Sequence, residues 1–168
     1  MIEIVNWKKK GLPEQADGCK NEMKLEFRAV SDNEAFARTA VAAFVTQLNP
    51  TLEEISDIKT AVSEAVTNAI IHGYEGEDSA ENRVLVHCII RNDVLEVEIS
   101  DSGVGIENIE KAMEPLFTTK PELDRSGMGF SFMEAFMDDL EVFSEIGQGT
   151  TVHMVKKLGI TPWIGDVE

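Results

Sequence analysis

The chain has 168 residues, enough for a single domain with its own hydrophobic core. Its 15 basic and 31 acidic residues give a formal net charge of −16, which argues against a protein that binds the phosphate backbone of nucleic acids. Such a charge favours a basic protein partner, although an acidic surface also serves solubility alone.

The two cysteines, Cys19 and Cys88, are too few and too far apart for a disulfide framework or a zinc site. Each is interpreted as an ordinary small residue, and their scarcity suits a reducing compartment. The chain starts with no apolar run behind its lysines, and no stretch approaches ~20 apolar residues. We therefore expect no signal peptide, no membrane span and a cytoplasmic location.

The first predicted element is a strand. Residues 1–20 precede it, show no clear periodicity and form an N-terminal extension without an assigned role. From Glu22 the segment MKLEFRA alternates apolar residues with charged neighbours, which indicates a half-buried strand.

Two helices are predicted next. Ser31 with Glu34, and Thr51 with Glu54, each match the pattern of a capping box, and Pro50 separates the two segments. The first helix has apolar residues at Phe36, Val41, Phe44, Val45 and Leu48, and the second runs to about Ile71 with a stripe of Ile55, Ile58, Val62, Ala65, Val66 and Ala69.

The rest of the chain is predicted as a polar loop (75–82), two strands (VLVHCII and VLEVEIS), a short helix (107–113), a long loop (115–126), a helix (130–139) and a hairpin (LEVFSE and TTVHMVKK). This order predicts an α+β fold, a two-layer sandwich whose mixed, mostly antiparallel sheet carries helices on one face. We expect one domain over residues 21–158 and a C-terminal tail over 159–168.

Three patterns in the sequence contain candidate functional residues, and the first two are as follows. Glu64 and Asn68 lie one helical turn apart and off the apolar stripe of the second helix, where a solvated helix face also explains them. Asp101 ends a strand and is followed by Gly103 and Gly105. The acid suits a hydrogen bond from an exocyclic amine such as that of adenine, and the glycines allow close approach to a flat ring. The same three residues also make ordinary turns.

A third pattern, Arg125-Ser126-Gly127-Met128-Gly129, leads into the helix over 130–139. Glycines at a helix N-terminus expose N–H groups that attract anions, so this segment suits phosphates, and Lys120 and Arg125 are candidates to reach a terminal phosphate. A flexible loop closed by a glycine-rich turn explains these residues equally well. No GxxxxGK segment occurs, which excludes a P-loop.

In this order and spacing, the three patterns resemble the ATP-binding family shared by gyrase, Hsp90, histidine kinases and MutL. The N-box is Glu64 and Asn68, the Asp-x-Gly-x-Gly box is Asp101, Gly103 and Gly105, and the lid ends in Gly127 and Gly129. The stretches NEMKLEF, SEAVTNAIIHGYE, PLFTTKPELDRSGMGF and FMEAFMDD further resemble the sporulation anti-sigma F factors, a family of small serine kinases. The resemblance covers about residues 21–158 and implies the Bergerat-type ATP-binding fold.

The resemblance implies a role for each matched residue. Glu64 is expected to be the general base that takes the proton of a serine hydroxyl, and Asn68 to coordinate Mg²⁺ on the phosphates of ATP. Asp101 is expected to recognise adenine, with Gly105 near the base. Phosphate binding and the lid are expected to involve Thr118, Thr119, Lys120, Arg125, Gly127, Met128 and Gly129.

The family also implies partners. The expected protein is a homodimer that clamps a sigma F-type RNA polymerase sigma factor and phosphorylates a serine of an anti-anti-sigma factor, without direct contact with nucleic acid or membrane. Arg38 is a candidate partner contact, although an exposed arginine of little effect explains it as well. None of His72, His87 and His153 has the setting of a phosphoacceptor, which argues against a histidine kinase.

Two alternatives to the serine kinase remain open. One is a non-catalytic, ATP-gated module that binds a sigma factor, against which the intact Glu64 argues. The other is an ATPase of the repair or topoisomerase type, which the short length and the acidic charge disfavour.

Overall fold

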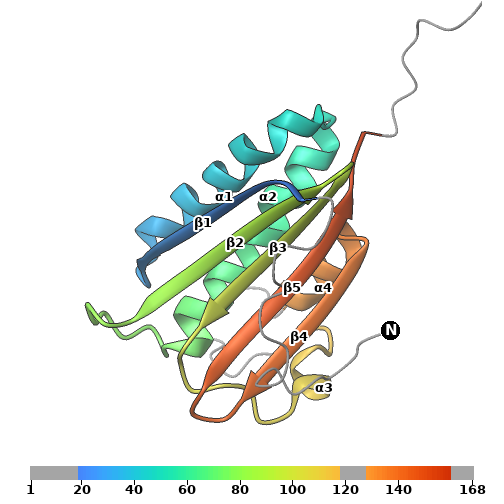
Figure 1. Cartoon of the computed structure of the whole chain (residues 1–168). Coiled ribbons are helices and arrows are strands. Elements are labelled where there is room, and N and C mark those ends of the chain that lie inside the picture. The colour runs from blue at the N-terminus through green and yellow to red at the C-terminus, as the bar shows by residue number, and fades with distance from the viewer. Residues whose placement is uncertain (1–18, 118–127, 160–168) are drawn as a thin grey trace, which may run out of the picture.

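The computed structural model describes residues 19–117 and 128–159, which form one sheet with helices packed against one of its faces (Figure 1). In chain order the elements are β1 (Cys19–Arg28), α1 (Asp32–Val45), the 3-10 turn η2 (Thr46–Leu48), α2 (Leu52–Asn68), the π turn η3 (Ala69–Gly73), β2 (Arg83–Arg91), β3 (Val94–Asp101), α3 (Ile109–Ala112), α4 (Gly129–Phe136), β4 (Asp139–Glu145) and β5 (Gly149–Lys157). The predicted two-layer α+β fold is confirmed. No helix in this described part has both the length and the apolarity needed to cross a bilayer.

The strands lie in the order β1-β2-β3-β5-β4, and each described pair of neighbours is antiparallel. β5 pairs with β3 although α3, α4 and β4 lie between them in the chain (Figure 1). As a result the end of β3 lies inside the sheet, with Asp101 opposite Val84 of β2 and Ser100 opposite Thr151 of β5. A residue at the end of β3 is therefore held from both sides.

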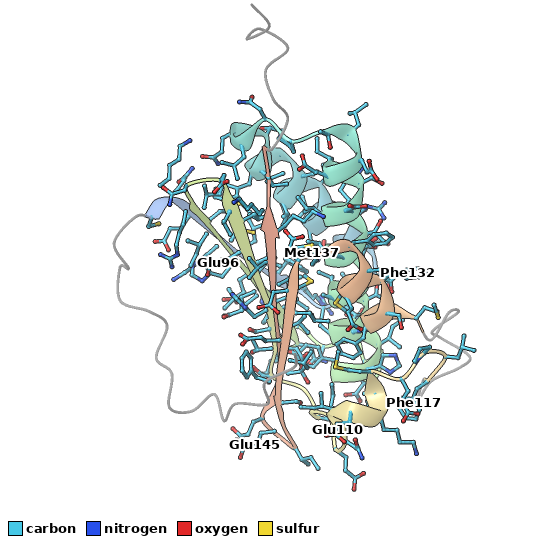
Figure 2. The ribbon with its side chains drawn as sticks, turned by 90° about the vertical axis from the view of Figure 1, so that its right-hand side faces the viewer. Glu96, Glu110, Phe117, Phe132, Met137 and Glu145 are labelled. Carbon is cyan, nitrogen blue, oxygen red and sulfur yellow. The ribbon has the colours of Figure 1, made fainter. Side chains whose placement is uncertain are left out.

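Alternate strand residues face the helices and form the core. Val86 and Cys88 of β2 are completely buried there, and burial raises the pKa of the Cys88 thiol to about 12. The thiol therefore stays protonated, as suits a small core residue. The opposite face of the sheet has no helix on it in the described part of the chain. Glu96 projects from that face (Figure 2) and pairs with Arg91 at 2.9 Å.

α1 begins at Asp32, close to its predicted start, but the predicted capping box of Ser31 and Glu34 is wrong. Ser31 already has helical dihedral angles (φ −57°, ψ −31°), so its side chain makes no capping hydrogen bond. The prediction that Phe36 belongs to the apolar face is also wrong, because its side chain is 57% exposed. The buried face is set by Val41 and the residues one turn before and after it, and Phe36 points away from that line.

The second predicted capping box is confirmed at the start of α2. The N–H of Glu54 donates to Thr51 Oγ1 at 3.1 Å, and the N–H of Thr51 donates to Glu54 Oε2 at 2.7 Å. At its other end α2 widens into the π turn η3, where the N–H of Tyr74 donates to the carbonyl of Ala69, five residues earlier, at 3.0 Å. The predicted helix end near Ile71 falls within this π turn.

Three further elements differ from the prediction. β1 begins at Cys19 rather than at Glu22, α3 spans Ile109–Ala112 rather than residues 107–113, and α4 ends at Phe136 rather than at Asp139. α4 stops early because Met137 takes an extended conformation (φ −103°, ψ 156°) that leads directly into β4.

The two capping boxes provide a test of the structure. Thr51→Ala should lower the free energy of unfolding by ~1 kcal/mol because the N–H of Glu54 loses its acceptor. Ser31→Ala should change it by less than about 0.5 kcal/mol because no capping hydrogen bond is lost. Urea unfolding of both variants measures the difference, and equal losses would contradict the structure at Ser31.

Candidate functional site

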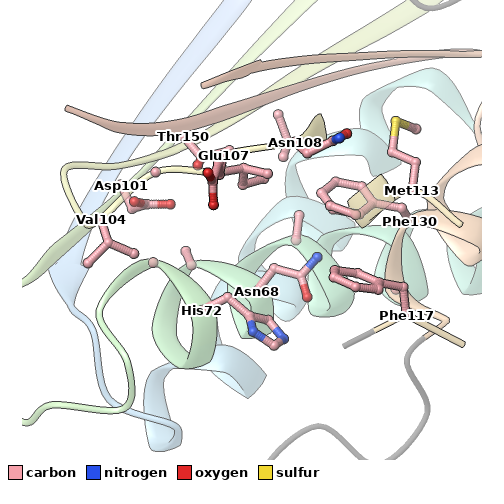
Figure 3. Close-up of a pocket in the computed structure, with 18 of the residues that line it drawn as sticks. Asn68, His72, Asp101, Val104, Glu107, Asn108, Met113, Phe117, Phe130 and Thr150 are labelled. Atoms are coloured by element: carbon pink, nitrogen blue, oxygen red, sulfur yellow. The ribbon is translucent and has the colours of Figure 1, made fainter. Parts of the chain in front are cut away.

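A cavity of about 550 Å³ opens between the sheet, α2, α3 and the start of α4 (Figure 3). This volume lies within the range of ~300–1,000 Å³ that is usual for small-molecule sites. Its polar lining residues include Asn68, His72, Glu75, Asp101, Glu107, Asn108, Lys111, Glu114, Ser131 and Thr150, and its larger apolar ones are Ile99, Val104, Ile106, Met113, Phe117, Phe130 and Val152. Such a wall suits a ligand with an apolar surface and several polar groups.

Glu64 and Asn68 lie where α2 meets the first residue of α4. A β-carbon built on Gly129 would lie 3.1 Å from Glu64 Oε2 and 3.3 Å from both polar atoms of the Asn68 amide. Ala61, one turn earlier on the same side of α2, is completely buried. Glu64 and Asn68 are therefore half-buried beside the start of α4 and do not lie on a fully solvated helix face.

Asp101 lines the cavity at the end of β3 (Figure 3). Its carboxylate accepts the N–H of Gly103 at 2.9 Å and the N–H of Thr150. Burial raises the pKa of Asp101 to about 6, and the two N–H donors limit this rise because they favour the charged form. A carboxylate held in this way has remaining lone pairs with which to accept a donor from a ligand.

The end of α2 and the loop after Asp101 cross at two glycines. A β-carbon on Gly73 would lie 2.7 Å from Cγ of Asp101, and one on Gly103 would lie 1.9 Å from the carbonyl oxygen of Gly73. The N–H of Val104 donates to that same carbonyl at 2.8 Å. Because glycine alone permits this approach, the crossing sets Asp101 directly against the end of α2.

Gly105, the second glycine of the box, has a different neighbour. Its φ is +77°, and a β-carbon on it would lie 2.3 Å from the carbonyl oxygen of Glu145. The N–H of Gly147 donates to the carbonyl of Val104 at 2.8 Å, so the box also packs on the turn between β4 and β5. Gly105 lines the cavity, whereas Gly103 packs behind Asp101 against Gly73.

Part of the predicted site falls outside the described residues, namely Thr118, Thr119, Lys120, Arg125 and Gly127. Met128 precedes α4 directly and is half-buried, and Gly129 opens the helix. The structure thus brings Glu64, Asn68 and Gly129 together. Asn68, Gly129 and Asp101 line the cavity, whereas Glu64 lies next to Gly129 and is not among the lining residues.

Sequence reasoning misses the aromatic part of the wall. Phe117 and Phe130 line the cavity (Figure 3), and the Lys111 ammonium lies 5.3 Å from the centroid of the Phe117 ring. Asn108 caps α3 by accepting the N–H of Lys111 at 2.9 Å. The sequence offers a signal for the Asn108 cap, but none that separates a cavity-lining phenylalanine from a core one.

A second, separate hollow of about 380 Å³ lies between α1 and α2. It is lined by Arg38, Leu52, Ile55, Ser56, Lys59, Thr60 and Ser63. Arg38 pairs with Glu34 at 3.4 Å and its side chain is 39% exposed. Leu52 is 87% exposed. Arg38 therefore stands beside an exposed apolar side chain, away from the first cavity.

The histidines lie as predicted, two in strands and one at the end of the helix with Glu64. His87 of β2 is only 6% exposed, and His153 of β5 lies 3.6 Å from Glu96 and 3.5 Å from Glu141. His72 lines the cavity. None of them stands on a separate exposed helix.

Comparison with known proteins gives a consistent result. The sequence profile of the histidine kinase-like ATPase domain matches residues 27–156. The chain is 59% identical over 138 residues to the anti-sigma F factor of Clostridium perfringens strain SM101, a match that covers 82% of this chain and 97% of the relative. It is 57% identical over 139 residues to the anti-sigma F factor of Oceanobacillus iheyensis, covering 83% of this chain and 94% of the relative.

A solved structure supports the fold. The crystal structure of the RsbU and RsbW domains of a Mycobacterium tuberculosis protein superposes with a TM-score of 0.60 at 18% sequence identity. The match covers 83% of this chain and 33% of that chain.

The crossing of the two glycines yields a prediction. Gly103→Ala should destabilise the fold by about 3 kcal/mol or more, because its β-carbon meets backbone atoms of Gly73 that cannot move aside. Gly147→Ala is the control: it has open space around it but a φ of +76°, so only about 1 kcal/mol should be lost. Urea unfolding compares the two, and a Gly103→Ala variant no less stable than Gly147→Ala would contradict the crossing.

Proposed function

Because the chain belongs to the histidine kinase-like ATPase family and, within it, to the anti-sigma F factors, we propose that it is an ATP-dependent serine kinase that also inhibits a sigma factor. The site just described would hold ATP between α2, α3, α4 and the sheet. The observation that carries the proposal is the arrangement of three groups: Glu64 and Asn68 lie against Gly129, and Asp101 lines the same cavity as Asn68 and Gly129.

The floor of the cavity fits adenine. The Asp101 carboxylate is held by the N–H groups of Gly103 and Thr150 and keeps lone pairs for the 6-amino group of the base. Apolar side chains beside it, including Ile99 and Val104, suit the ring itself. Asp101 would therefore recognise the base, with Gly105 next to it.

The side of the cavity next to α4 fits the phosphates. The first N–H groups of an α-helix attract anions, and Gly129 at the start of α4 lines the cavity together with Asn68. The proposed phosphate and lid residues are Thr118, Thr119, Lys120, Arg125, Gly127, Met128 and Gly129. The proposed Mg²⁺ ion would be held by Asn68, the phosphates and water, because an amide oxygen suits a hard cation that keeps most of its waters. Bound there, Mg²⁺ would neutralise charge on the transferred phosphoryl group.

Glu64 is the proposed general base. It would take the proton of the serine hydroxyl as the serine oxygen bonds to the γ-phosphorus and the bond from that phosphorus to the bridging oxygen breaks, releasing ADP. The i, i+4 spacing on α2 places this base one turn from Asn68, and both contact the start of α4. The base and the phosphate-binding groups are thus supported by the same helix pair.

The proposed partners follow from the relatives. The curated relatives are named anti-sigma F factors, and we extend to this chain the binding of a sigma F-type sigma factor during sporulation, in the cytoplasm, by a homodimer. The serine substrate would be an anti-anti-sigma factor. Arg38 is the proposed partner contact, because it stands beside the exposed Leu52 and the hollow between α1 and α2.

Replacing the base gives the sharpest test. Glu64→Gln should bind Mg·ATP nearly as tightly as the wild type but transfer its γ-phosphoryl group about 100-fold more slowly or worse. The assay uses γ-labelled ATP and the purified anti-anti-sigma factor of the same organism, with ATP binding measured by calorimetry. Asn68→Ala should instead weaken the binding of Mg·ATP itself.

The control is Glu53→Gln, which removes the same charge from the exposed first turn of α2 and should leave transfer unchanged. If Glu64→Gln transfers the γ-phosphoryl group as fast as the wild type, Glu64 is not the general base. ATP-dependent binding of the sigma factor without labelling of any serine by the wild type would leave a non-catalytic module.

Adenine recognition predicts a pH dependence. The Asp101 pKa is about 6 in the folded chain, so below that value the carboxyl becomes protonated and is a poorer acceptor for the 6-amino group. ATP affinity should be constant above about pH 7 and fall by about tenfold in total as the carboxyl becomes protonated below about pH 6, because only the hydrogen bond to the amino group is lost. The comparison ligand is purine riboside triphosphate, which has the same phosphates and no amino group. A ratio of the two dissociation constants that does not change between about pH 5 and pH 8 would contradict the role of Asp101.

A further inference from the structure

Tyr74 is the only tyrosine of the chain and follows the π turn η3 directly. Its half-buried ring packs against the hydrophobic core, and it is not among the described residues that line the cavity. The established family features and the three sequence patterns leave it without a role. Its hydroxyl nevertheless contacts the segment that carries Asp101.

The hydroxyl of Tyr74 makes two hydrogen bonds. It donates to the carbonyl of Arg83 at 2.5 Å, at the start of β2, and accepts the N–H of Ser102 at 2.8 Å. Ser102 is the residue directly after Asp101. One side-chain atom therefore joins the end of α2, the start of β2 and the end of β3.

These bonds complete a set of contacts around Asp101. The carbonyl of Gly73 accepts the N–H of Val104 at 2.8 Å, and the Asp101 carboxylate accepts the N–H of Gly103 at 2.9 Å. The Tyr74 hydroxyl is the only side-chain acceptor for the N–H of Ser102 among the described residues. Without it, this N–H would lose that hydrogen bond. The peptide between Asp101 and Gly103 would then lose one of the contacts that fix it, and the N–H of Gly103, which holds the carboxylate, would be less precisely oriented.

We propose that Tyr74 is a positioning residue that fixes the direction of the Asp101 carboxylate through Ser102 and thereby sets the preference for an adenine base. The inference rests on the proposed function, in which Asp101 accepts the 6-amino group. Phosphate binding depends on α2 and α4 instead, so the effect of Tyr74 is confined to the base.

Tyr74→Phe keeps the ring and removes both hydrogen bonds. Dissociation constants for ATP and for purine riboside triphosphate are measured by calorimetry with Mg²⁺, on the full chain. The wild type should prefer ATP about tenfold or more, since a hydrogen bond to a charged acceptor is at stake. In Tyr74→Phe this preference should shrink to about threefold or less, KM for ATP should rise, and kcat at saturating ATP should stay within about twofold.

Asn82→Ala is the matched control. The Asn82 amide donates to the carbonyl of Glu77 at 3.0 Å and so orders the loop between Tyr74 and β2 without touching Ser102. It should lower stability by a comparable amount and leave the preference for ATP intact. A loss of preference in both variants, or in neither, would overturn the inference.

Two more outcomes separate the inference from its premise. If the wild type binds both triphosphates equally tightly, Asp101 does not accept the 6-amino group of adenine. The role inferred for Tyr74 would then be wrong as well. Should Tyr74→Phe not fold, amide hydrogen exchange of the wild type decides: slow exchange at Ser102 without nucleotide supports the hydrogen bond, and exchange as fast as in an open loop rejects it.

Discussion

The end of α2 and the loop after Asp101 cross so closely that a β-carbon on Gly103 would meet the carbonyl group of Gly73, and one on Gly73 would meet the Asp101 carboxylate. This crossing ties the end of α2 to the end of β3, and the cavity floor is made of these two ends. Because β3 lies between β2 and β5, the crossing is also anchored in the interior of the sheet. The position of the Asp101 backbone relative to α2 thus follows from the packing of Gly103 on the backbone of Gly73, whereas the direction of its carboxylate is the part that we assign to Tyr74.

The opposite side of the cavity depends on α4. This helix is anchored by Met133, which is completely buried, and by Met137, which is 5% exposed just after the helix ends (Figure 2). The anchor holds Gly129 against Glu64 and Asn68. The charged side chain of Glu64 and the amide of Asn68 are in this way half-buried, so their electrostatic effect on a ligand is larger than on an exposed helix.

The sequence predicts most of the elements because strand alternation and turn residues are local signals, as the segments around Val86 and Val97 show. It predicts a capping box at both Ser31 and Thr51, and only the second exists, because the cap depends on the dihedral angles of the capping residue. Periodicity alone leaves Glu64 on a solvated face, since the helix that covers it lies far along the chain. Only the resemblance to a family, and no local pattern, indicates that Glu64 belongs to a site.

Because α2 ends in the π turn η3, the number of residues in this turn matters for the position of Gly73 as much as their identity does. The N–H of Tyr74 reaches back five residues to Ala69, so the turn contains one residue more than an α-helical turn. Deleting a single residue between Ala69 and Gly73 would restore an α-helical turn and rotate everything after it by about 100°. Gly73 would then leave the crossing with Gly103. We therefore expect insertions and deletions to be tolerated better in the exposed loop around Asp78 than in the turn before it.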